Sequence, residues 1–425
     1  MNIYIKNARL LDPVTGIDKT DGLLIKNGII TEIGQLPDTE KDIEVWDVQG
    51  ALVTPGLMDM HIHLREPGRE DEETITTGSD AAAAGGFTAV ACMPNTEPAI
   101  DSAEVVEYIR KRAEGHIVDV YAIGAATTER KGELIAPIGE LVEAGAVAFS
   151  DDGVAIKTAK ILRRVMEYAK MYDKPVIEHC EDETLAGGAM HEGITSTRLG
   201  LPGIPAIAEE LTVVRDIMMA ELTGARVHIA HISTAKAVQL VREGKAKGIN
   251  VTAEVAPHHF TMTDEAVTEY DTNAKMNPPL RTKADVEAMI AGLKDGTIDV
   301  IATDHAPHSP EEKEMEFEYA PNGILGLETA IGLTCTELVH KGHLTLSDMV
   351  TKLAINPRRI LNLKVPAIKT GEEANLTIFN PDHQWTVDVK KFKSKSRNSP
   401  FDGFTLKGKA LGVINKNQIY RGNLQ

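Results

Sequence analysis

Eight short apolar segments alternate with helix-like segments through the middle of the chain, and this alternation constrains the fold more than any other feature. Helical stretches such as 156–172 and 204–222 lie between most of them. Repeated strand–helix units form parallel sheets, and eight units in about 310 residues fit a (β/α)8 barrel, with a doubly wound sheet as the alternative. The apolar segments are 56–64, 86–95, 117–127, 146–152, 174–180, 226–233, 249–259 and 298–308.

The two ends of the chain have a different pattern. Residues 1–53 and 367–425 alternate like strands joined by turns. Neither end carries enough apolar surface for a core of its own. We therefore expect an α/β protein in which a TIM-like (β/α)8 barrel, residues 54–366, is flanked by one small β-sandwich domain built from both termini.

Charge and cysteine content exclude several classes of protein. The formal net charge is −18, which disfavours nucleic acid and anionic membranes as partners. No run of about 18 apolar residues is present, so we expect no membrane span. The chain has 3 cysteines, widely spaced, which does not suit a disulfide framework and indicates a reducing, cytoplasmic location.

Several of the predicted strands end in a side chain of the kind that binds metals. In a barrel the carboxyl ends of the strands surround one mouth, so these side chains should converge there. His61 and His63 share a face of one strand, because side chains alternate, and Asp59 should orient an imidazole from one step deeper. By the same alternation His228 should face away from His231. We expect His258 and His259, at the end of the seventh segment, to lie in a loop. The candidate ligands are His61, His63, Asp151, His179, His231 and Asp304.

Four imidazoles and two carboxylates suffice for two metal ions that share a bridge. Neutral imidazole is the commonest protein ligand of zinc-type metals. A pair of such ions can polarise a carbonyl and activate water near neutral pH. The pattern thus predicts a hydrolytic metal centre at the mouth of the barrel.

Two motifs resemble the signatures of dihydroorotases, which belong to the amidohydrolase superfamily. They are DMHIHLREPG at 59–68 and ATDHAPHS at 302–309, near opposite ends of the predicted barrel. The resemblance extends over essentially the whole chain. It implies one or two Zn²⁺ ions, with two favoured. Many members of the superfamily bridge their metals with a carboxylated lysine; here the fourth strand reads AVAFSDDG, and Asp151 resembles the bridging aspartate of the bacterial class I enzymes.

The resemblance also implies substrate contacts and a reaction. Asp304 would be both a metal ligand and the proton carrier in the reversible, metal-dependent cyclisation of N-carbamoyl-L-aspartate to L-dihydroorotate and water. Hydroxide attacks the amide carbonyl in ring opening, and Asp304 takes a proton and returns it to the leaving nitrogen. Arg65 and Asn95 would hold the substrate carboxylate. The further implied contacts are Asn277, His308 and the backbone of segment 322–329, including Gly323, Leu325 and Gly326.

Other functions remain open on the sequence. Hydantoinases and allantoinases also open cyclic amides, but the former lack the REPG run and the latter tend to have Asn at the position of Arg65. A non-catalytic scaffold would typically have lost metal ligands. The resemblance makes a homodimer and association with aspartate carbamoyltransferase plausible. The charged segment 309–321 beside the mouth fits either a solvated loop or a mobile lid.

Overall fold

The predicted alternation of strand and helix is present in the middle of the chain. The computed structural model describes residues 1–37 and 43–422. Each of the eight predicted segments contains a strand, and neighbouring strands pair in parallel. One group is β6 (Leu57–Ile62), β7 (Phe87–Cys92) and β8 (Asp119–Ala122); the other is β9 (Gly124–Ala125), β10 (Phe149–Ser150), β11 (Val176–Glu178), β14 (Val227–Ile229), β15 (Val251–Val255) and β16 (Val300–Ile301).

The two groups of strands meet at both of their ends. A single residue, Ile123, separates β8 from β9. At the other end Ile62 of β6 forms a parallel bridge with His305, which follows β16. Most residues of these strands are buried and most of the buried ones are apolar, as expected where a parallel sheet is covered by helices; Asp59, His228 and Glu254 are among the buried polar exceptions.

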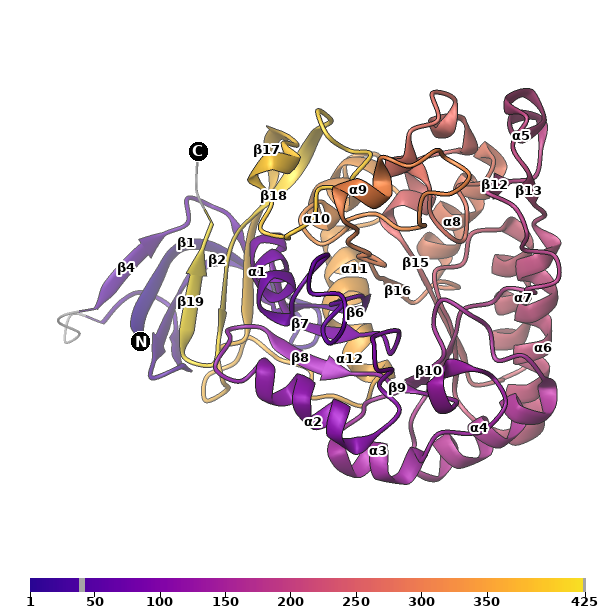
Figure 1. Cartoon of the computed structure of the whole chain (residues 1–425). Coiled ribbons are helices and arrows are strands. Elements are labelled where there is room, and N and C mark those ends of the chain that lie inside the picture. Colours follow the sequence, from indigo (N-terminus) through magenta and orange to yellow (C-terminus); the bar gives the residue numbers. More distant parts are fainter. Residues whose placement is uncertain (38–42, 423–425) are drawn as a thin grey trace.

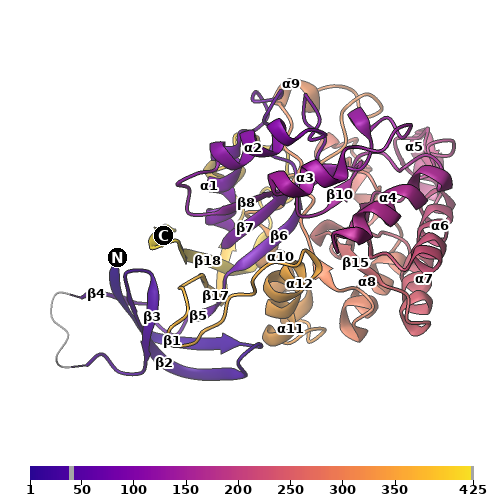
Figure 2. The same ribbon diagram turned by 90° about the horizontal axis from the view of Figure 1, so that it is seen from below.

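Helices cover the outer face of these strands (Figures 1 and 2). In α4 the buried side chains Ile161, Leu162, Val165, Met166 and Ala169 follow the helical period, and the Thr158 side chain caps the first turn. The helices are α1 (Ile75–Gly85), α2 (Ala103–Arg112), α3 (Ile138–Ala144), α4 (Ala159–Met171), α5 (Ile194–Leu199), α6 (Ile207–Thr223), α7 (Ala235–Ala246), α8 (Lys283–Asp295), α9 (Pro310–Lys313), α10 (Ala330–Thr334), α11 (Leu346–Val350) and α12 (Asn356–Ile360).

Shorter elements connect them. The strands β12 (Met190–His191) and β13 (Gly203–Ile204) pair with each other, with α5 between them. Two π-helical turns cover Cys335–Val339 and Thr351–Ile355. The 3-10 turns are Thr128–Arg130, Pro257–Phe260, Asp264–Val267, Thr272–Ala274 and Val389–Lys391.

The two ends of the chain form one sheet, as the sequence indicated. Its order is β19-β18-β17-β5-β1-β2-β3, with β4 paired to β1. Antiparallel pairing of β17 with β5, for example Ile378 with Val53, joins the C-terminal strands to the N-terminal ones. The sheet lies at one end of the molecule (Figure 1). Its strands are β1 (Asn2–Asp12), β2 (Ile17–Lys26), β3 (Ile29–Ile33), β4 (Glu44–Asp47), β5 (Leu52–Pro55), β17 (Leu376–Thr386), β18 (Thr405–Asn415) and β19 (Gln418–Arg421).

The α/β character of the chain is therefore confirmed. In the described part of the chain, no helix combines the length and the apolar character that crossing a membrane requires.

Candidate metal centre and active site

The four predicted histidine ligands lie together at the carboxyl ends of the parallel strands. The ring centroids of His61 and His63 are 5.6 Å apart, and those of His61 and His231 are 4.9 Å apart. His179 lies next to His231, with centroids separated by 4.8 Å. All four side chains are buried. Strands that are far apart in sequence thus bring these imidazoles to one place.

Two sets of potential metal ligands within residues 1–37 and 43–422 share His61. One set is His61, His63 and Asp304, and the other is His61, Asp152 and His231. The Nε2 atom of His63 lies 3.0 Å from Asp304 Oδ1, and the Nε2 atom of His61 lies 3.2 Å from Asp152 Oδ1. Two metal ions that lie side by side need two adjacent sets of ligands, and here the two sets have His61 in common.

Asp152, and not the predicted Asp151, faces the imidazoles. The Asp151 carboxylate accepts hydrogen bonds from the backbone nitrogen of Thr127, at 2.9 Å, and from its hydroxyl, at 2.5 Å. Those bonds turn it toward the neighbouring strand end. The geometry therefore corrects the sequence-based choice between the two adjacent aspartates by one residue.

Each of the first two histidines is held so that Nε2 faces a carboxylate. The Nδ1 atom of His61 donates to Glu254 at 2.5 Å, and Nδ1 of His63 donates to Asn95 Oδ1 at 2.8 Å. A neutral imidazole that donates through Nδ1 presents a lone pair at Nε2. The Nε2 atom of His61 and Oδ1 of Asp152 are both buried, and neither has a hydrogen-bond partner in the part of the chain that the structure describes.

This arrangement fits a bound cation. A nitrogen lone pair and a carboxylate oxygen that face each other without a proton repel unless a positive charge lies between them. Nitrogen and carboxylate donors in small sets match zinc-type ions. The orienting contacts from Glu254 and Asn95 are of the kind that fixes the tautomer of a metal-binding histidine.

The electrostatics of the cluster agree with this fit. Burial disfavours the charged imidazole of His61, but Asp152 and Glu254 raise its pKa well above the usual value. Burial likewise opposes ionisation of Asp304, yet the neighbouring imidazoles of His63, His61 and His231 hold its pKa well below the usual range. The buried carboxylates are thus stabilised by positive charge beside them, and a bound metal ion would supply that charge.

His179 lies beside the two ligand sets and not within either. Its Nδ1 is 3.1 Å from Nε2 of His231. On its other side, Asn277 Nδ2 lies 3.4 Å from its Nε2 and donates to Glu181 at 3.1 Å. The side-chain oxygen of Asn277, Oδ1, is buried and has no hydrogen-bond partner among the described residues, so it is available to another group.

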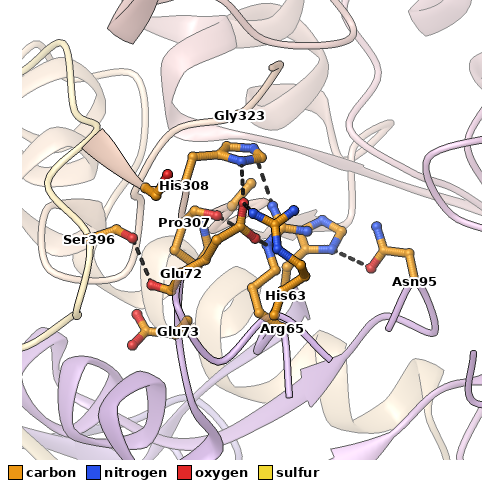
Figure 3. A network of polar contacts seen from close by, with 12 residues as sticks. His63, Arg65, Glu72, Glu73, Asn95, Pro307, His308, Gly323 and Ser396 are labelled. Atoms are coloured by element: carbon orange, nitrogen blue, oxygen red, sulfur yellow. Dashed lines mark hydrogen bonds and ion pairs between the residues drawn. The ribbon is translucent and has the colours of Figure 1, made fainter. Parts of the chain in front are cut away.

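Arg65 and His308, both predicted substrate contacts, lie next to each other and share a carboxylate (Figure 3). Arg65 Nη2 is 3.3 Å from His308 Nε2. Glu72 lies 2.9 Å from Arg65 Nε and accepts from His308 Nδ1 at 2.8 Å. A third set with metal-type side chains, Glu72, His308 and Glu312, is engaged in these ion pairs and with Arg69. We interpret it as a salt-bridge network.

Asn398, from the C-terminal part of the chain, fixes the loops on the other side of His308. Its side-chain nitrogen donates to the carbonyl oxygens of Ala306, at 2.9 Å, and Gly323, at 3.1 Å. Its side-chain oxygen accepts from the backbone nitrogen of His308 at 3.1 Å, and its carbonyl accepts from Leu325 at 2.9 Å. One buried side chain thus links the loop after β16 to the segment that begins at Gly323.

The segment 323–326 leaves no room for larger side chains. A Cβ on Gly323 would lie 2.6 Å from the Ala306 Cβ, and its φ of 133° disfavours other residues. A Cβ on Gly326 would lie 2.5 Å from the Thr303 Cβ. Leu325 is buried between them. The glycines therefore let the backbone approach the loop that carries Asp304 and His308.

Three residues of the site have strained backbones. Arg65, His231 and Asp304 have φ values of 60°, 26° and 50°, a region that residues other than glycine rarely adopt. Such strain concentrates at functional sites, where the surrounding structure enforces it. At all three positions the chain has just left a strand.

Two predictions about neighbouring residues were wrong. Asp59 accepts hydrogen bonds from the backbone nitrogens of His61 and Thr303, at 3.1 Å each, and so joins two strand ends and does not orient an imidazole. His228 is fully buried and donates to Glu254 at 3.1 Å, so it belongs to the same interior network as His61.

The segments around the mouth are anchored. His258 and His259 form part of the buried 3-10 turn Pro257–Phe260 after β15. Within the charged segment 309–321, Lys313 is buried and its ammonium donates to the carbonyl oxygens of Thr272, at 2.9 Å, and Pro321, at 2.8 Å. Phe317 packs in an apolar cluster. This segment is therefore not simply a solvated loop.

Known proteins resemble this chain over its whole length. The family model described as Dihydro-orotase-like matches residues 50–237. A dihydroorotase of Pelotomaculum thermopropionicum is 54% identical over 97% of both chains, and one of Syntrophus aciditrophicus is 49% identical over 99% of both. Among solved structures, the L-hydantoinase (dihydropyrimidinase) of Arthrobacter aurescens has a TM-score of 0.88 at 23% identity and covers 100% of this chain and 97% of its own.

These likenesses agree with the two motifs at 59–68 and 302–309. The structural likeness at 23% identity shows a shared fold and no more. The full-length relatives at about half identity carry the assignment of the family. The chain belongs to the dihydroorotase family, which confirms the predicted class of enzyme, a cyclic amide hydrolase.

Proposed function

We propose that the protein catalyses the reversible cyclisation of N-carbamoyl-L-aspartate to L-dihydroorotate plus water, a step of pyrimidine (UMP) biosynthesis. One observation carries the proposal: a cluster of metal-type ligands lies beside Arg65, a largely but not fully buried arginine, in a chain 54% identical to a named dihydroorotase. The substrate has a reacting amide and a carboxylate close together. The cluster suits the amide, and Arg65 suits the carboxylate.

Arg65 is the residue that we assign to the substrate carboxylate. Its guanidinium can form a fork of parallel hydrogen bonds to such a group. Glu72 and the Pro307 carbonyl, which accepts from Arg65 Nε at 3.0 Å, hold one edge of the guanidinium and leave the rest for substrate. Asn95 offers its amide nitrogen to the same carboxylate, since its oxygen is taken by His63. Asn277, His308 and the backbone of Gly323, Leu325 and Gly326 would surround the ring.

We assign the ligand set to His61, His63, Asp152, His179, His231 and Asp304, with Zn²⁺ as the metal and two ions favoured over one. The common member His61 supports two adjacent ions. When bound, such ions supply Lewis-acid polarisation of the amide carbonyl and lower the pKa of water. His61 and His63 are pre-oriented for this role by Glu254 and Asn95.

Asp304 carries the proton. In ring opening it accepts a proton from the attacking water and passes it to the amide nitrogen as the C–N bond breaks; ring closure runs in reverse. Its carboxylate is buried, so bulk water competes poorly for the proton. Its Oδ1 lies 3.0 Å from His63 Nε2, which places the carboxylate between the ligand cluster and the loop that carries His308.

The test compares dihydroorotate with 5,6-dihydrouracil, the same ring without the carboxylate. We expect the wild type to prefer dihydroorotate strongly. Arg65→Met should lose most of that preference, and kcat/KM for dihydroorotate should fall about 10- to 150-fold, because a charge-assisted contact contributes about 1.5–3 kcal/mol. Arg65→Lys, a point charge without the fork, should fall in between. Equal turnover of both rings by the wild type would make the protein a hydantoinase-like hydrolase.

We also propose the closure of the barrel, the bounds of the two domains, the partners of the protein and its location in the cell. The bridge between Ile62 and His305 supports closure of the eight strands into a (β/α)8 barrel. We place the barrel at 54–366 and a β-sandwich domain at 1–53 and 367–425. A homodimer, association with aspartate carbamoyltransferase and a cytoplasmic location stay predictions. Co-purification with the transferase from the native cell would test the association.

A further inference from the structure

The strands β17 and β18 of the terminal sheet pack against α1 and α10 of the central part of the chain (Figure 1). A cleft of about 690 Å³, which we call the β17–β18 cleft, lies where these elements meet. Clefts of about 300–1,000 Å³ are of the size that holds small organic molecules. The side chains of the metal ligands do not line this one, so it is separate from the site described above. Its wall includes Gly85 of α1, Ile331 of α10, Trp385 of β17 and Lys409 of β18.

The cleft is basic in an otherwise acidic protein. Residues 389–410, which form much of its wall, include seven Lys or Arg residues and one acidic residue, whereas the whole chain has a formal net charge of −18. Three of the lysines, Lys391, Lys393 and Lys409, line the cleft. Within the described residues Lys393 and Lys409 form no ion pair, and Lys391 has a single contact of 3.5 Å with Asp388. Burial and the nearby charge of Lys391 lower the pKa of Lys409, so these ammonium groups lie close enough to repel each other.

Glu328, which also lines the cleft, does not cancel this charge near neutral pH. Burial raises the pKa of its carboxyl group to about 8, although the backbone nitrogens of Lys393 and Ser394 donate to its Oε1 at 2.7 Å and 3.1 Å. The group is therefore mostly uncharged at pH 7. An uncharged carboxyl group has an O–H that can donate to an anion. The β17–β18 cleft thus favours a negatively charged ligand.

Trp385 gives the cleft an aromatic wall of fixed orientation. Its indole nitrogen donates to the carbonyl of Gly408 at 2.8 Å, which holds the ring against β18. The Nζ atom of Lys409 lies 5.5 Å from the centre of that ring. Tyr420 of β19 lines the same cleft, and both aromatic side chains are half-buried. Aromatic side chains stack on planar bases, and lysine binds phosphate as a point charge. The combination matches a ligand that has both a planar ring and a phosphate group.

The wall of the cleft continues along the chain into the support of the active site. After the two backbone contacts with Glu328, the hydroxyl of Ser394 donates to the Glu73 carboxylate at 2.5 Å. The hydroxyl of Ser396 then donates to the carbonyl of Glu72 at 2.7 Å. The side chain of Glu72 holds Arg65, as described above. One short segment therefore borders the cleft at one end and supports the guanidinium of Arg65 at the other.

We propose that the β17–β18 cleft binds a nucleoside phosphate, and that its occupancy strengthens binding of the substrate carboxylate at Arg65. The base stacks on Trp385, and the phosphate lies among Lys391, Lys393 and Lys409. A ligand that pairs with Lys391 and Lys393 fixes the segment that continues to Glu72. Because coupling between two binding sites is reciprocal, the substrate must strengthen nucleotide binding in turn.

Trp385 reports on its own surroundings in the first test. The chain has 2 tryptophans, so Trp46→Phe leaves Trp385 as the only one. In this full-length protein, AMP or UMP, one large base and one small, should quench the tryptophan fluorescence with a dissociation constant below about 1 mM. Added salt should weaken the binding, because it screens exposed charges. Adenosine and uridine, which lack the phosphate, should bind at least about tenfold more weakly.

Two outcomes of this titration would contradict the proposal. Absence of quenching by either nucleotide at millimolar concentration would overturn it. Equal affinity for nucleoside and nucleotide would show that the lysines do not bind the phosphate.

Lysine variants place the ligand within the cleft. Lys409→Gln removes the charge and keeps a polar side chain, and it should raise the dissociation constant at least about tenfold, because a charge-assisted hydrogen bond is lost. Lys407→Gln is the matched control, since Lys407 lies on the same strand, is exposed and does not line the cleft. Lys393→Gln changes an exposed side chain and should also weaken binding, so the test does not depend on how well Lys409→Gln folds. Unchanged affinity in both Lys409→Gln and Lys393→Gln would mean that the nucleotide binds elsewhere and would refute the proposal.

The coupling is tested with substrate. This part rests on the proposed function, whereas the titration of Trp385 decides whether nucleotide binds even if dihydroorotate is not turned over. Saturating nucleotide should lower KM for dihydroorotate about twofold or more in the wild type and leave KM unchanged in Lys409→Gln. Dihydroorotate should likewise tighten nucleotide binding in the Trp46→Phe protein. An unchanged KM, or one that rises equally in wild type and Lys409→Gln as expected for competition at the catalytic mouth, would overturn the coupling.

Discussion

The adjacent aspartates Asp151 and Asp152 allow the assignment of the metal ligands to be tested one residue at a time. Asp152→Asn keeps the shape of the side chain and removes its charge. That carboxylate lies 3.2 Å, 3.6 Å and 3.7 Å from the Nε2 atoms of His61, His63 and His231. A unit charge about 4 Å from another contributes about 4 kcal/mol at an effective dielectric constant of about 20. We therefore expect zinc affinity to fall by about 10³-fold, since about 1.4 kcal/mol corresponds to a factor of ten.

Asp151→Asn is the matched control. The Asp151 carboxylate accepts two hydrogen bonds from Thr127 and makes no ion pair with the imidazoles. An asparagine keeps one acceptor and turns an NH₂ group toward a donor of Thr127. Because a buried polar group that loses its partner costs about 1–3 kcal/mol, the free energy of unfolding should fall by that amount, while zinc affinity should change less than about tenfold.

Three measurements separate the two outcomes. Competition with a chromophoric chelator gives the zinc affinity, thermal denaturation gives the stability, and the ultraviolet absorbance of dihydroorotate gives the activity in both directions. Asp152→Asn should lose zinc and activity but remain folded; Asp151→Asn should keep both with a lower melting temperature. The opposite pattern, with zinc lost from Asp151→Asn and kept by Asp152→Asn, would refute the geometric assignment.

Three further substitutions test other parts of the site. Asp304→Asn, assayed with saturating zinc, should lower kcat about 10²-fold or more in both directions, and near-normal rates would rule out a proton carrier at this position. Glu254→Gln should weaken zinc binding about 10- to 100-fold in chelator competition, because it removes the charged acceptor that orients His61; unchanged affinity would show that the contact is dispensable. Asn398→Ala should raise KM for dihydroorotate about tenfold with zinc content unchanged, whereas an unaltered KM would mean that the loops hold their positions alone.

The positions of the strands followed from the sequence because parallel strands buried on both faces are continuous apolar runs. The faces of the residues just beyond the strands did not. The strand β10 consists only of Phe149 and Ser150, so alternation of side chains has ended before the aspartates are reached. The strand β14 likewise ends at Ile229, and the φ of 26° at His231 resets the direction of its side chain. Counting residues from His228 therefore gave the wrong face.

The sequence around Glu254 could have predicted that this residue pairs with a histidine of the site. It interrupts the apolar segment VTAEV of β15, and a glutamate in a fully buried strand is rare unless another group pairs with it. With many histidines predicted at the strand ends, a partner was available. Asn398 carried no such signal, because 90 residues separate it from His308 and its segment follows the irregular turn after β17.

The two halves of the site depend on different parts of the chain. The ligand cluster is held by the parallel strands, whereas the region around Arg65 and His308 also depends on residues 394–399 of the C-terminal part. Ser396 donates to the Glu72 carbonyl at 2.7 Å (Figure 3). The backbone nitrogen of Lys395 donates to the Glu73 carboxylate at 3.1 Å. Since Glu72 in turn holds Arg65 and His308, loosening this segment should disturb recognition of the carboxylate before it disturbs the metal. The segment between the C-terminal strands is thus part of the active-site support, and we expect variants that loosen it to lose the preference for a carboxylated ring while retaining the metal ligands.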